Sequence, residues 1–359
     1  MNTVHVNLGS RSYEILVAPG LLAETGSRIQ GAGLTGMAAI ITDNNVAPHF
    51  LERVKTSLLE IGYNFSSHIF PAGEASKSMA QVESLSRELI QAGHNRSSFV
   101  IALGGGVTGD LAGFVASIFY RGIPFVQIPT TIVSQVDSAV GGKTGVNAPE
   151  GKNLIGAFHQ PRLVLTDPET LLTLPGREFR EGFAEVIKHA AIRDEAMFAD
   201  LEALDPLDQN IPSELIARNV AIKARVVEDD EEETSGTRAL LNFGHTIGHG
   251  IEASVPYGTL LHGEAISLGI RAALTLSERH ADLAPEASQR ILDLLTHYQL
   301  PLILSDDIST DLVMKKLSRD KKFSGGEKTF VLLDRPGNGI TCNSIPFEEI
   351  APTIDSLRS

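Results

Sequence analysis

Short apolar runs recur along the first half of the chain, and each ends in glycine or in a polar turn. The runs MAAIITDNN (37–45), SFVIALGGG (98–106) and PFVQIPTT (124–131) each predict a buried strand followed by a loop. A helix predicted over 78–93 carries its apolar positions on one face, at Met79, Val82, Leu85, Leu89 and Ile90. Such alternation favours a parallel sheet with helices on its faces, whose ligands gather at the carboxyl ends of the strands.

The second half has a different pattern. Residues 178–204, 212–227 and 283–298 show helical periodicity, and strand signals are few. The length of 359 residues also exceeds what one hydrophobic core usually supports. We therefore predict an α/β domain with a Rossmann-like parallel sheet over 1–175, and a mostly α-helical domain over 176–359.

Composition narrows the classes of function. The apolar fraction of 42% and charged fraction of 21% are ordinary for a globular protein. The net charge of −14 argues against a general nucleic-acid or anionic-membrane surface, although a small anionic substrate remains compatible. The single cysteine, Cys342, excludes an internal disulfide and a cysteine-based zinc site. The first 17 residues lack signal-peptide features, and no apolar run approaches the ~18 residues of a membrane span, so we expect a soluble cytoplasmic protein.

Two glycine-rich segments suggest anion binding. VIALGGGVTGD fits G-x-G-x-x-G at Gly104, Gly106 and Gly109, which indicates either a pyrophosphate site or a ligand-free tight turn. The acidic residue expected after the next strand is missing, so any dinucleotide site departs from the standard Rossmann unit. SAVGGKTGVN (138–147) contains Gly-Lys-Thr, but a P-loop also requires glycine five residues before Gly142, and that position is Asp137, which excludes the motif. Lys143 and Lys152 are either solvent lysines or an anion site.

Histidines four residues apart suggest a metal site. His245 and His249 would share a helix face, but the glutamate of H-E-x-x-H is absent. Glu185, on a mostly apolar helix, could complete a catalytic zinc site, and His189 competes as a ligand. Spacing alone leaves packed histidines as an alternative. The remaining histidines are expected at surface or incidental positions, namely His5, His49, His68, His94, His280 and His297.

The chain resembles the 3-dehydroquinate synthase family of sugar-phosphate cyclases between about Asp43 and Lys322. The resemblance is carried by GGGVTGD, YRGIPFVQIPTTIVSQVDSAVGGKTGVN, GKNLIGAFHQP, EGFAEVIKHA, RALLNFGHTIGH and LHGEA. It implies an NAD-binding α/β domain, a helical domain that binds a divalent metal (Zn²⁺ or Co²⁺) and substrate, and a homodimer.

The resemblance also assigns residues to roles. The implied metal ligands are Glu185, His245 and His262, which leaves His249 beside the substrate and gives His189 no ligand role. The implied NAD contacts are Asp43, Glu74, Lys77, Gly105, Gly106, Asp110, Thr130, Thr131, Lys143, Lys152, Thr170, Leu171, Leu172 and Thr173. The implied substrate and catalytic residues are Arg121, Asp137, Lys143, Lys152, Asn153, Lys188, Lys223, Arg238, Asn242, His249, and Lys321 or Lys322.

The implied reaction converts 3-deoxy-D-arabino-heptulosonate 7-phosphate to 3-dehydroquinate and phosphate. It proceeds by transient oxidation with NAD, phosphate elimination, re-reduction and intramolecular aldol closure. Converging cations would let an acidic protein hold a substrate with a carboxylate and a phosphate. The alternatives are a related cyclase for sedoheptulose 7-phosphate, a metal-dependent polyol dehydrogenase and a non-catalytic NAD-binding regulator.

Two departures from the family pattern stand out. Gly250 occupies a position where alanine is common, which is expected to loosen the helix locally. The acidic run at 229–233 is one residue longer than usual, so any of Glu231 to Glu233 could take the family's glutamate position. From its composition alone this run predicts a solvated loop.

Overall fold

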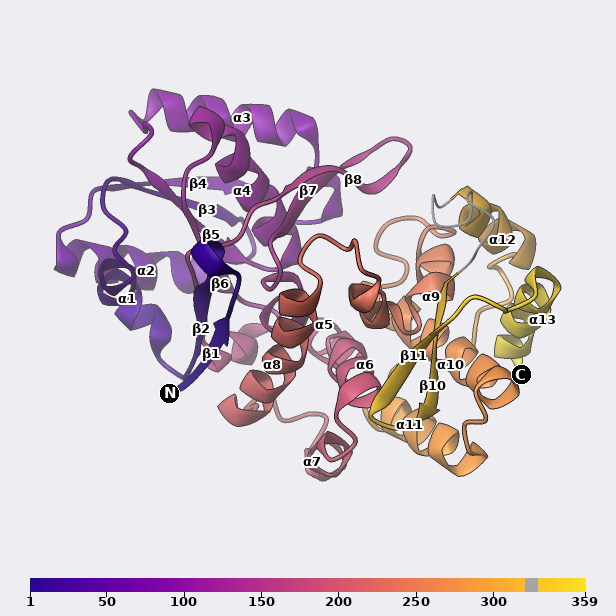
Figure 1. Ribbon diagram of the computed structural model, residues 1–359. Helices are drawn as coiled ribbons and strands as arrows, with labels where there is room; N and C mark the ends of the chain where they lie inside the picture. The colour runs from indigo at the N-terminus through magenta and orange to yellow at the C-terminus, as the bar shows by residue number, and fades with distance from the viewer. Residues whose placement is uncertain (320–328) are drawn as a thin grey trace. The chain divides into compact units, whose positions relative to one another are not determined.

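The computed structural model describes residues 1–319 and 329–359. The chain forms two compact units, and Figure 1 is coloured along its sequence. Unit 1 comprises Met1–Leu174 and Asn210–Glu232, and unit 2 comprises Pro175–Gln209 and Glu233–Ser359. Within the described ranges, no helix has the length and apolar character needed to cross a membrane.

Unit 1 is built on a seven-stranded sheet in the order β1-β2-β9-β6-β5-β3-β4. All neighbouring strands are parallel except β1 and β2, which pair antiparallel. The strands are β1 Asn2–Val6, β2 Tyr13–Val17, β3 Ala38–Asp43, β4 Phe65–Phe70, β5 Phe99–Gly104, β6 Phe125–Pro129 and β9 Leu163–Thr166. The three strands predicted from apolar runs are confirmed as β3, β5 and β6.

Helices cover both faces of this sheet (Figure 1), which explains the uninterrupted apolar runs of its central strands. Ile40 of β3 belongs to the core under α1 and α2, and Ile41 belongs to the core under α3 and α4. Each fully buried isoleucine contributes about 1.5–3 kcal/mol to stability. The helices are α1 Thr25–Gly31, α2 Ala47–Ile61, α3 Met79–Gln91 and α4 Gly106–Ile118. The helix predicted over 78–93 is confirmed as α3, and the Ser78 hydroxyl caps it by accepting from the Gln81 amide.

Helix α8, Ser213–Asp229, returns to unit 1 although the sequence placed it beyond the single expected boundary. It packs against β1, β2 and the π-helical turn η5, Ser134–Ser138. Glu228 near its end accepts hydrogen bonds from the backbone and side-chain nitrogens of Asn7, at 2.6 and 2.7 Å. The helix is therefore held to the first unit by contacts that its own periodicity does not reveal.

Unit 2 is mostly helical, as expected. Its helices are α5 Gly176–Glu181, α6 Phe183–Arg193, α7 Met197–Ala203, α9 His245–Glu252, α10 His262–His280, α11 Pro285–His297, α12 Thr310–Arg319 and α13 Ile350–Asp355. The periodic stretch 178–204 is divided into α5, α6 and α7. The break after α6 lies at Asp194, which leaves helical geometry with φ −149° and ψ 82°. The hairpin of β10 (Phe330–Arg335) and β11 (Asn338–Cys342) was not predicted, because its short apolar run gives a weak strand signal.

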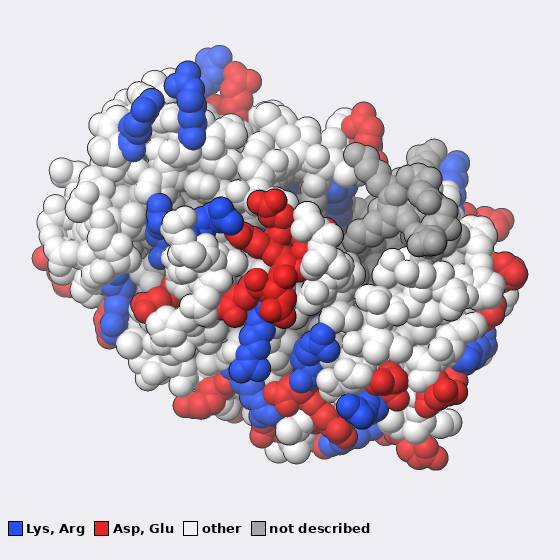
Figure 2. All heavy atoms as spheres, in the orientation of Figure 1, with Lys and Arg blue, Asp and Glu red and all other residues white. Residues whose placement is uncertain are grey.

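Shorter elements complete both units. A second antiparallel hairpin, β7 Lys143–Ala148 with β8 Gly151–Phe158, belongs to unit 1. The short 3-10 helices are η1 Gly9–Arg11, η2 Leu21–Glu24, η3 Glu74–Ser76, η4 Phe119–Arg121, η6 Pro168–Thr173, η7 Thr237–Asn242, η9 Phe347–Glu349 and η10 Ser356–Arg358. Figure 2 shows one face of the molecule, on which acidic side chains gather near the centre and basic side chains lie around them.

Candidate functional site

The carboxyl ends of β3, β5 and β6 meet at one edge of the unit 1 sheet. Gly104 at the end of β5 pairs with Pro129 at the end of β6. Thr130 and Thr131 therefore lie beside the glycine-rich segment 104–109, here called the glycine loop. Asp43 ends β3, and its carboxylate accepts a hydrogen bond from the Thr108 hydroxyl at 3.0 Å. The sheet topology therefore gathers Asp43, the glycine loop and the two threonines, as the sequence predicted.

The third glycine of the G-x-G-x-x-G pattern has a packing role. A Cβ atom on Gly109 would lie 2.6 Å from the Gln127 side-chain oxygen of β6. Glycine at this position therefore lets α4 approach the sheet closely. The amino terminus of α4 follows β5 directly, with Gly105 as its N-cap, and a helix start of this kind favours anions.

A second group of predicted cofactor and substrate residues surrounds the buried ammonium of Lys77. The Lys77 ammonium pairs with the Asp110 carboxylate at 2.5 Å and donates a hydrogen bond to the Asn153 side-chain oxygen. Burial raises the pKa of Asp110, and the Lys77 ammonium offsets part of that rise. Glu74 accepts from the Asn147 amide at 2.8 Å. These contacts bring residues 73–77, α4 and the β7–β8 hairpin together in unit 1.

The other residues assigned to unit 1 have varied surroundings. Lys223 of α8 donates to both the backbone oxygen and the carboxylate of Asp137, at 2.7 Å each. Arg121 is exposed, with a left-handed φ of 69°, a backbone conformation that costs about 1–3 kcal/mol. Among the remaining assigned positions, Thr170 and Leu171 of η6 are buried and Lys152 is half-buried, whereas Lys143, Leu172 and Thr173 are exposed.

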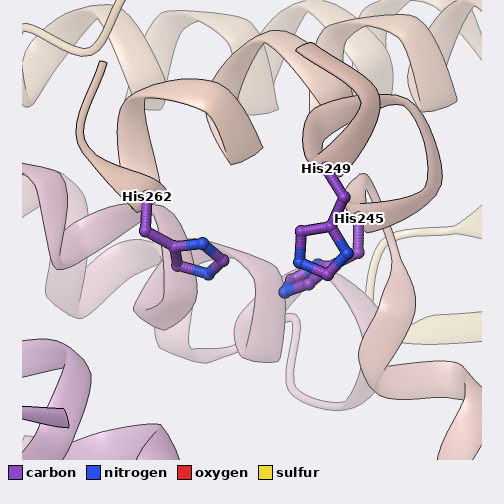
Figure 3. A group of neighbouring side chains, drawn as sticks. All are labelled: His245, His249 and His262. Carbon is purple, nitrogen blue, oxygen red and sulfur yellow. The ribbon is translucent and has the colours of Figure 1, made fainter. Parts of the chain in front are cut away.

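In unit 2, helices α9 and α10 each bring a histidine next to Glu185 of α6. The Glu185 carboxylate is fully buried. Its Oε1 atom is 3.3 Å from Nε2 of His245, the first residue of α9, and 3.4 Å from Nε2 of His262, the first residue of α10. Its other oxygen accepts a hydrogen bond from the buried Lys188 ammonium. Figure 3 shows the imidazoles of His245, His249 and His262 as neighbours.

The charges around Glu185 depend on one another. Burial alone would raise the pKa of Glu185, but the Lys188 ammonium and the imidazoles outweigh it and hold the pKa well below its usual range. Burial lowers the pKa of His245. For His262, burial is outweighed by Glu185 and Glu252, and its pKa rises to about 10. The centre thus keeps an ionised carboxylate in a buried position.

The donor set fits a single divalent ion. With ligand bonds of about 2.1 Å, two ligand atoms of a tetrahedral ion lie about 3.4 Å apart. The separations of Glu185 Oε1 from the two Nε2 atoms match this value. Among the described residues, this buried oxygen also accepts no hydrogen bond of good geometry. Glu185, His245 and His262 could therefore hold a metal.

His249 lies beside this donor set: its ligand atom is within 4.8 Å of those of His245 and His262, so distance does not exclude it as a metal ligand. The His249 ring centroid is 5.1 Å from that of His245 and 5.8 Å from that of His262. Its side chain is exposed, whereas His245 and His262 are partly buried. His189 is fully buried in α6. The position of His249 suits a group that faces solvent or a ligand beside the metal.

The other assigned residues of unit 2 lie in η7 or outside the described residues. Arg238 is buried although it is one of the largest side chains, and Asn242 is half-buried. Lys321 and Lys322 lie outside the described residues.

The sequence did not predict the burial of two histidines, His68 and His94, or their polar contacts. His68 and His94, expected at surface or incidental positions, are both buried, and their Nε2 atoms contact the Ser66 hydroxyl at 2.7 and 2.6 Å. Glu88 pairs with the other nitrogen of His68 at 3.0 Å. Strand alternation could have suggested burial of His68, because it lies two residues before the buried Phe70.

The acidic run is more ordered than a solvated loop. Glu231 forms a two-pronged ion pair with Arg11, at 3.0 and 2.6 Å, and accepts from the Gln160 amide at 2.9 Å. These contacts hold the segment that follows α8 to parts of unit 1 that are far away in the chain. The composition of the acidic run could not indicate such contacts.

Comparisons with known proteins agree with this geometry. The N-terminal domain of 3-dehydroquinate synthase matches residues 67–181, and the C-terminal domain matches residues 182–323. The 3-dehydroquinate synthase of Pelobacter propionicus is 45% identical over 96% of both chains. That of Azotobacter vinelandii is 44% identical over 99% of this chain and 97% of its own.

A solved structure extends the agreement to three dimensions. The 2-epi-5-epi-valiolone synthase of Streptomyces hygroscopicus, solved with NAD⁺ and Zn²⁺ bound, superposes with a TM-score of 0.89 at 29% identity, over 98% of both chains. Near-complete coverage by relatives well above 30% identity leaves one conclusion: the chain belongs to the 3-dehydroquinate synthase family.

Proposed function

We propose that this protein converts 3-deoxy-D-arabino-heptulosonate 7-phosphate to 3-dehydroquinate and phosphate. The observation that carries the proposal is the convergence of Glu185, His245 and His262 at separations suited to one ion, in a chain of this family. A protein that only bound NAD would not require a buried carboxylate and two imidazoles at one point.

The proposal includes NAD and a divalent metal, Zn²⁺ or Co²⁺. The structurally similar 2-epi-5-epi-valiolone synthase was solved with NAD⁺ and Zn²⁺, which supports this assignment. When bound, the metal polarises a substrate hydroxyl and NAD serves as a transient hydride acceptor that each cycle regenerates. Asp43, the glycine loop and Thr130 are proposed to contact NAD, because they share the ligand-binding edge of the sheet.

The residues of the centre prepare it for this chemistry. Lys188 keeps Glu185 ionised and oriented by donating to Oε2, whereas Oε1 is the oxygen next to the two imidazole nitrogens. His249 is more exposed than His245 and His262 and, as the family resemblance implies, is proposed to contact the substrate without binding the metal. With a metal bound, the imidazoles of His245 and His262 would be neutral ligands beside the fixed negative charge of Glu185, in an environment where electrostatic interactions are strong.

Buried cations are proposed to bind the two anionic groups of the substrate. They include Lys188, Arg238 and Lys223, and Lys223 pairs with Asp137. Charge-assisted hydrogen bonds from such groups overcome the unfavourable net charge of the protein. A substrate without a carboxylate would leave some of these groups unpaired, which disfavours a cyclase for sedoheptulose 7-phosphate.

Turnover tests the proposal directly. The purified protein, supplied with Zn²⁺, NAD and the heptulosonate phosphate, should release phosphate without net formation of NADH. Steady accumulation of NADH with a polyol would indicate a dehydrogenase instead. Turnover of sedoheptulose 7-phosphate alone would indicate the related cyclase, and NAD binding without any turnover would indicate a regulator.

The proposal extends to a cytoplasmic homodimer. Leu154, Ile155 and Phe158 of β8 are exposed to 54%, 38% and 47%, and such an apolar group suits a subunit interface. Analytical ultracentrifugation of the purified protein should give twice the mass of the chain. A monomer at micromolar concentration would contradict this part.

A further inference from the structure

Both proposed imidazole ligands have their second nitrogen held by an acceptor, but the acceptors differ. Nδ1 of His245 lies 3.1 Å from the backbone carbonyl of Phe243. Nδ1 of His262 lies 3.3 Å from a carboxylate oxygen of Glu252, the last residue of α9. One ligand is therefore backed by a neutral backbone group and the other by a charged side chain.

This difference matters because an imidazole binds a metal through a nitrogen that carries no proton. A carboxylate that accepts a hydrogen bond from Nδ1 keeps the proton there and leaves Nε2 available. It also makes Nε2 a stronger donor of electron density and fixes the orientation of the ring. In this centre, Nε2 of His262 is the atom that faces Glu185.

We propose that Glu252 is a positioning residue for the metal centre and acts through His262. The inference rests on the proposed function, in which Glu185, His245 and His262 hold a divalent ion. The Glu252 side chain is 12% exposed, so its carboxylate is shielded from water and its effect on the imidazole is strong. The same effect cannot be removed at His245 by a side-chain substitution, because a backbone oxygen provides it.

A purely structural role for Glu252 predicts different behaviour. The start of α10 has its own supports: Glu181 accepts from the Gly263 amide at 2.6 Å, and Glu264 accepts from the Leu261 amide at 2.8 Å. Glu264 also pairs with Arg177 at 2.7 Å. The helix start should therefore persist without Glu252. Glu264 is a matched control, because it supports the same turn and makes no contact with the His262 ring in the described structure.

The experiment measures Zn²⁺ binding by full-length protein that has been stripped with a chelator. Affinity is determined by competition with a chromogenic chelator for the wild type, Glu252→Ala, Glu252→Gln, Glu264→Gln and Glu185→Gln. Glu252→Ala should weaken binding about 10- to 100-fold, with a smaller loss for Glu252→Gln, whose amide oxygen still accepts a hydrogen bond. Glu264→Gln should bind Zn²⁺ like the wild type.

A spectroscopic readout separates positioning from folding. With Co²⁺ in place of Zn²⁺, the visible absorption bands should shift in Glu252→Ala and shift less in Glu252→Gln, because the donor strength of His262 changes. Unchanged bands and Zn²⁺ affinity within twofold of the wild type, in folded Glu252→Ala, would overturn the positioning role. If Glu252→Ala does not fold, the isosteric Glu252→Gln decides in the same way. A wild type that binds Zn²⁺ no better than Glu185→Gln would overturn the metal site itself, which is a different result.

Discussion

Replacement of Gly250 by alanine tests how closely α9 and α12 pack. A Cβ atom at this position would lie 2.8 Å from Cγ and 2.9 Å from Cδ2 of Leu317, and 3.2 Å from a methyl carbon of Val313. Both neighbours are buried residues of α12. The glycine therefore has a packing role, whereas comparison with the family pattern suggested only a looser helix.

Two opposing effects set the magnitude. Alanine in the interior of a helix is favoured over glycine by about 1 kcal/mol. Carbon atoms normally approach to about 3.5–4.0 Å, so Leu317 must move by several tenths of an ångström. Overpacking of this kind costs about 1–3 kcal/mol, and we expect Gly250→Ala to lower the free energy of unfolding by about 1 kcal/mol.

A double-mutant cycle with Leu317→Ala isolates the contact. Once Leu317 is truncated, only the 3.2 Å approach to Val313 remains, and Gly250→Ala should then raise the free energy of unfolding by up to about 1 kcal/mol. Urea denaturation followed by circular dichroism measures both effects. Gly31→Ala at the end of α1 is the control, because its Cβ would meet nothing within 4 Å. If Gly250→Ala stabilises the protein equally with and without Leu317, the close packing of α9 and α12 is refuted.

The remaining predictions concern metal binding and buried charges. Glu185→Gln should abolish stoichiometric Zn²⁺ binding, whereas His249→Ala should retain the metal and lose turnover; a metal-free His249→Ala, measured by elemental analysis, would show that the ligand set is wrong. Burial, together with the charge of the neighbouring imidazole, lowers the pKa of His94 to about 4, against about 6.5 when unfolded, so the unfolded state gains the proton first and stability falls as pH drops. Between pH 7 and 5 this should cost about 2 kcal/mol of unfolding free energy in the wild type, and His94→Gln should lack that loss in urea titrations at the two pH values. Lys77→Met should destabilise the protein by about 3 kcal/mol because it leaves the Asp110 carboxylate without its cation, and adding Asp110→Asn should recover most of that loss in the same assay.

The parts of the fold that sequence patterns predicted are those governed by local rules. β3, β5 and β6 are buried on both faces, and their continuous apolar runs report this directly. The hairpin β10–β11 and the return of α8 to unit 1 escaped prediction. A short strand resembles any short apolar run, and the contacts of α8 with β1 depend on residues far away in the chain.

The candidate site shows the same division. The burial of Glu185 could be anticipated from its apolar helix, and the spacing of His245 and His249 marked them as possible ligands. Spacing could not separate these two histidines, because both lie on α9. Nor could it reveal Glu252, whose role depends on how the end of α9 meets the start of α10.

The sequence by itself determined the division into an α/β part and a helical part, the exclusion of cysteine-based sites and the membership of a family, because these follow from composition, periodicity and ordered motifs. Only the tertiary structure decided which imidazoles share an oxygen of Glu185, which glutamate backs His262, and why Gly250 must be small. The physical reason is that hydrogen bonds, ion coordination and van der Waals contacts act over a few ångströms, whereas the residues that make them are tens of positions apart in the chain.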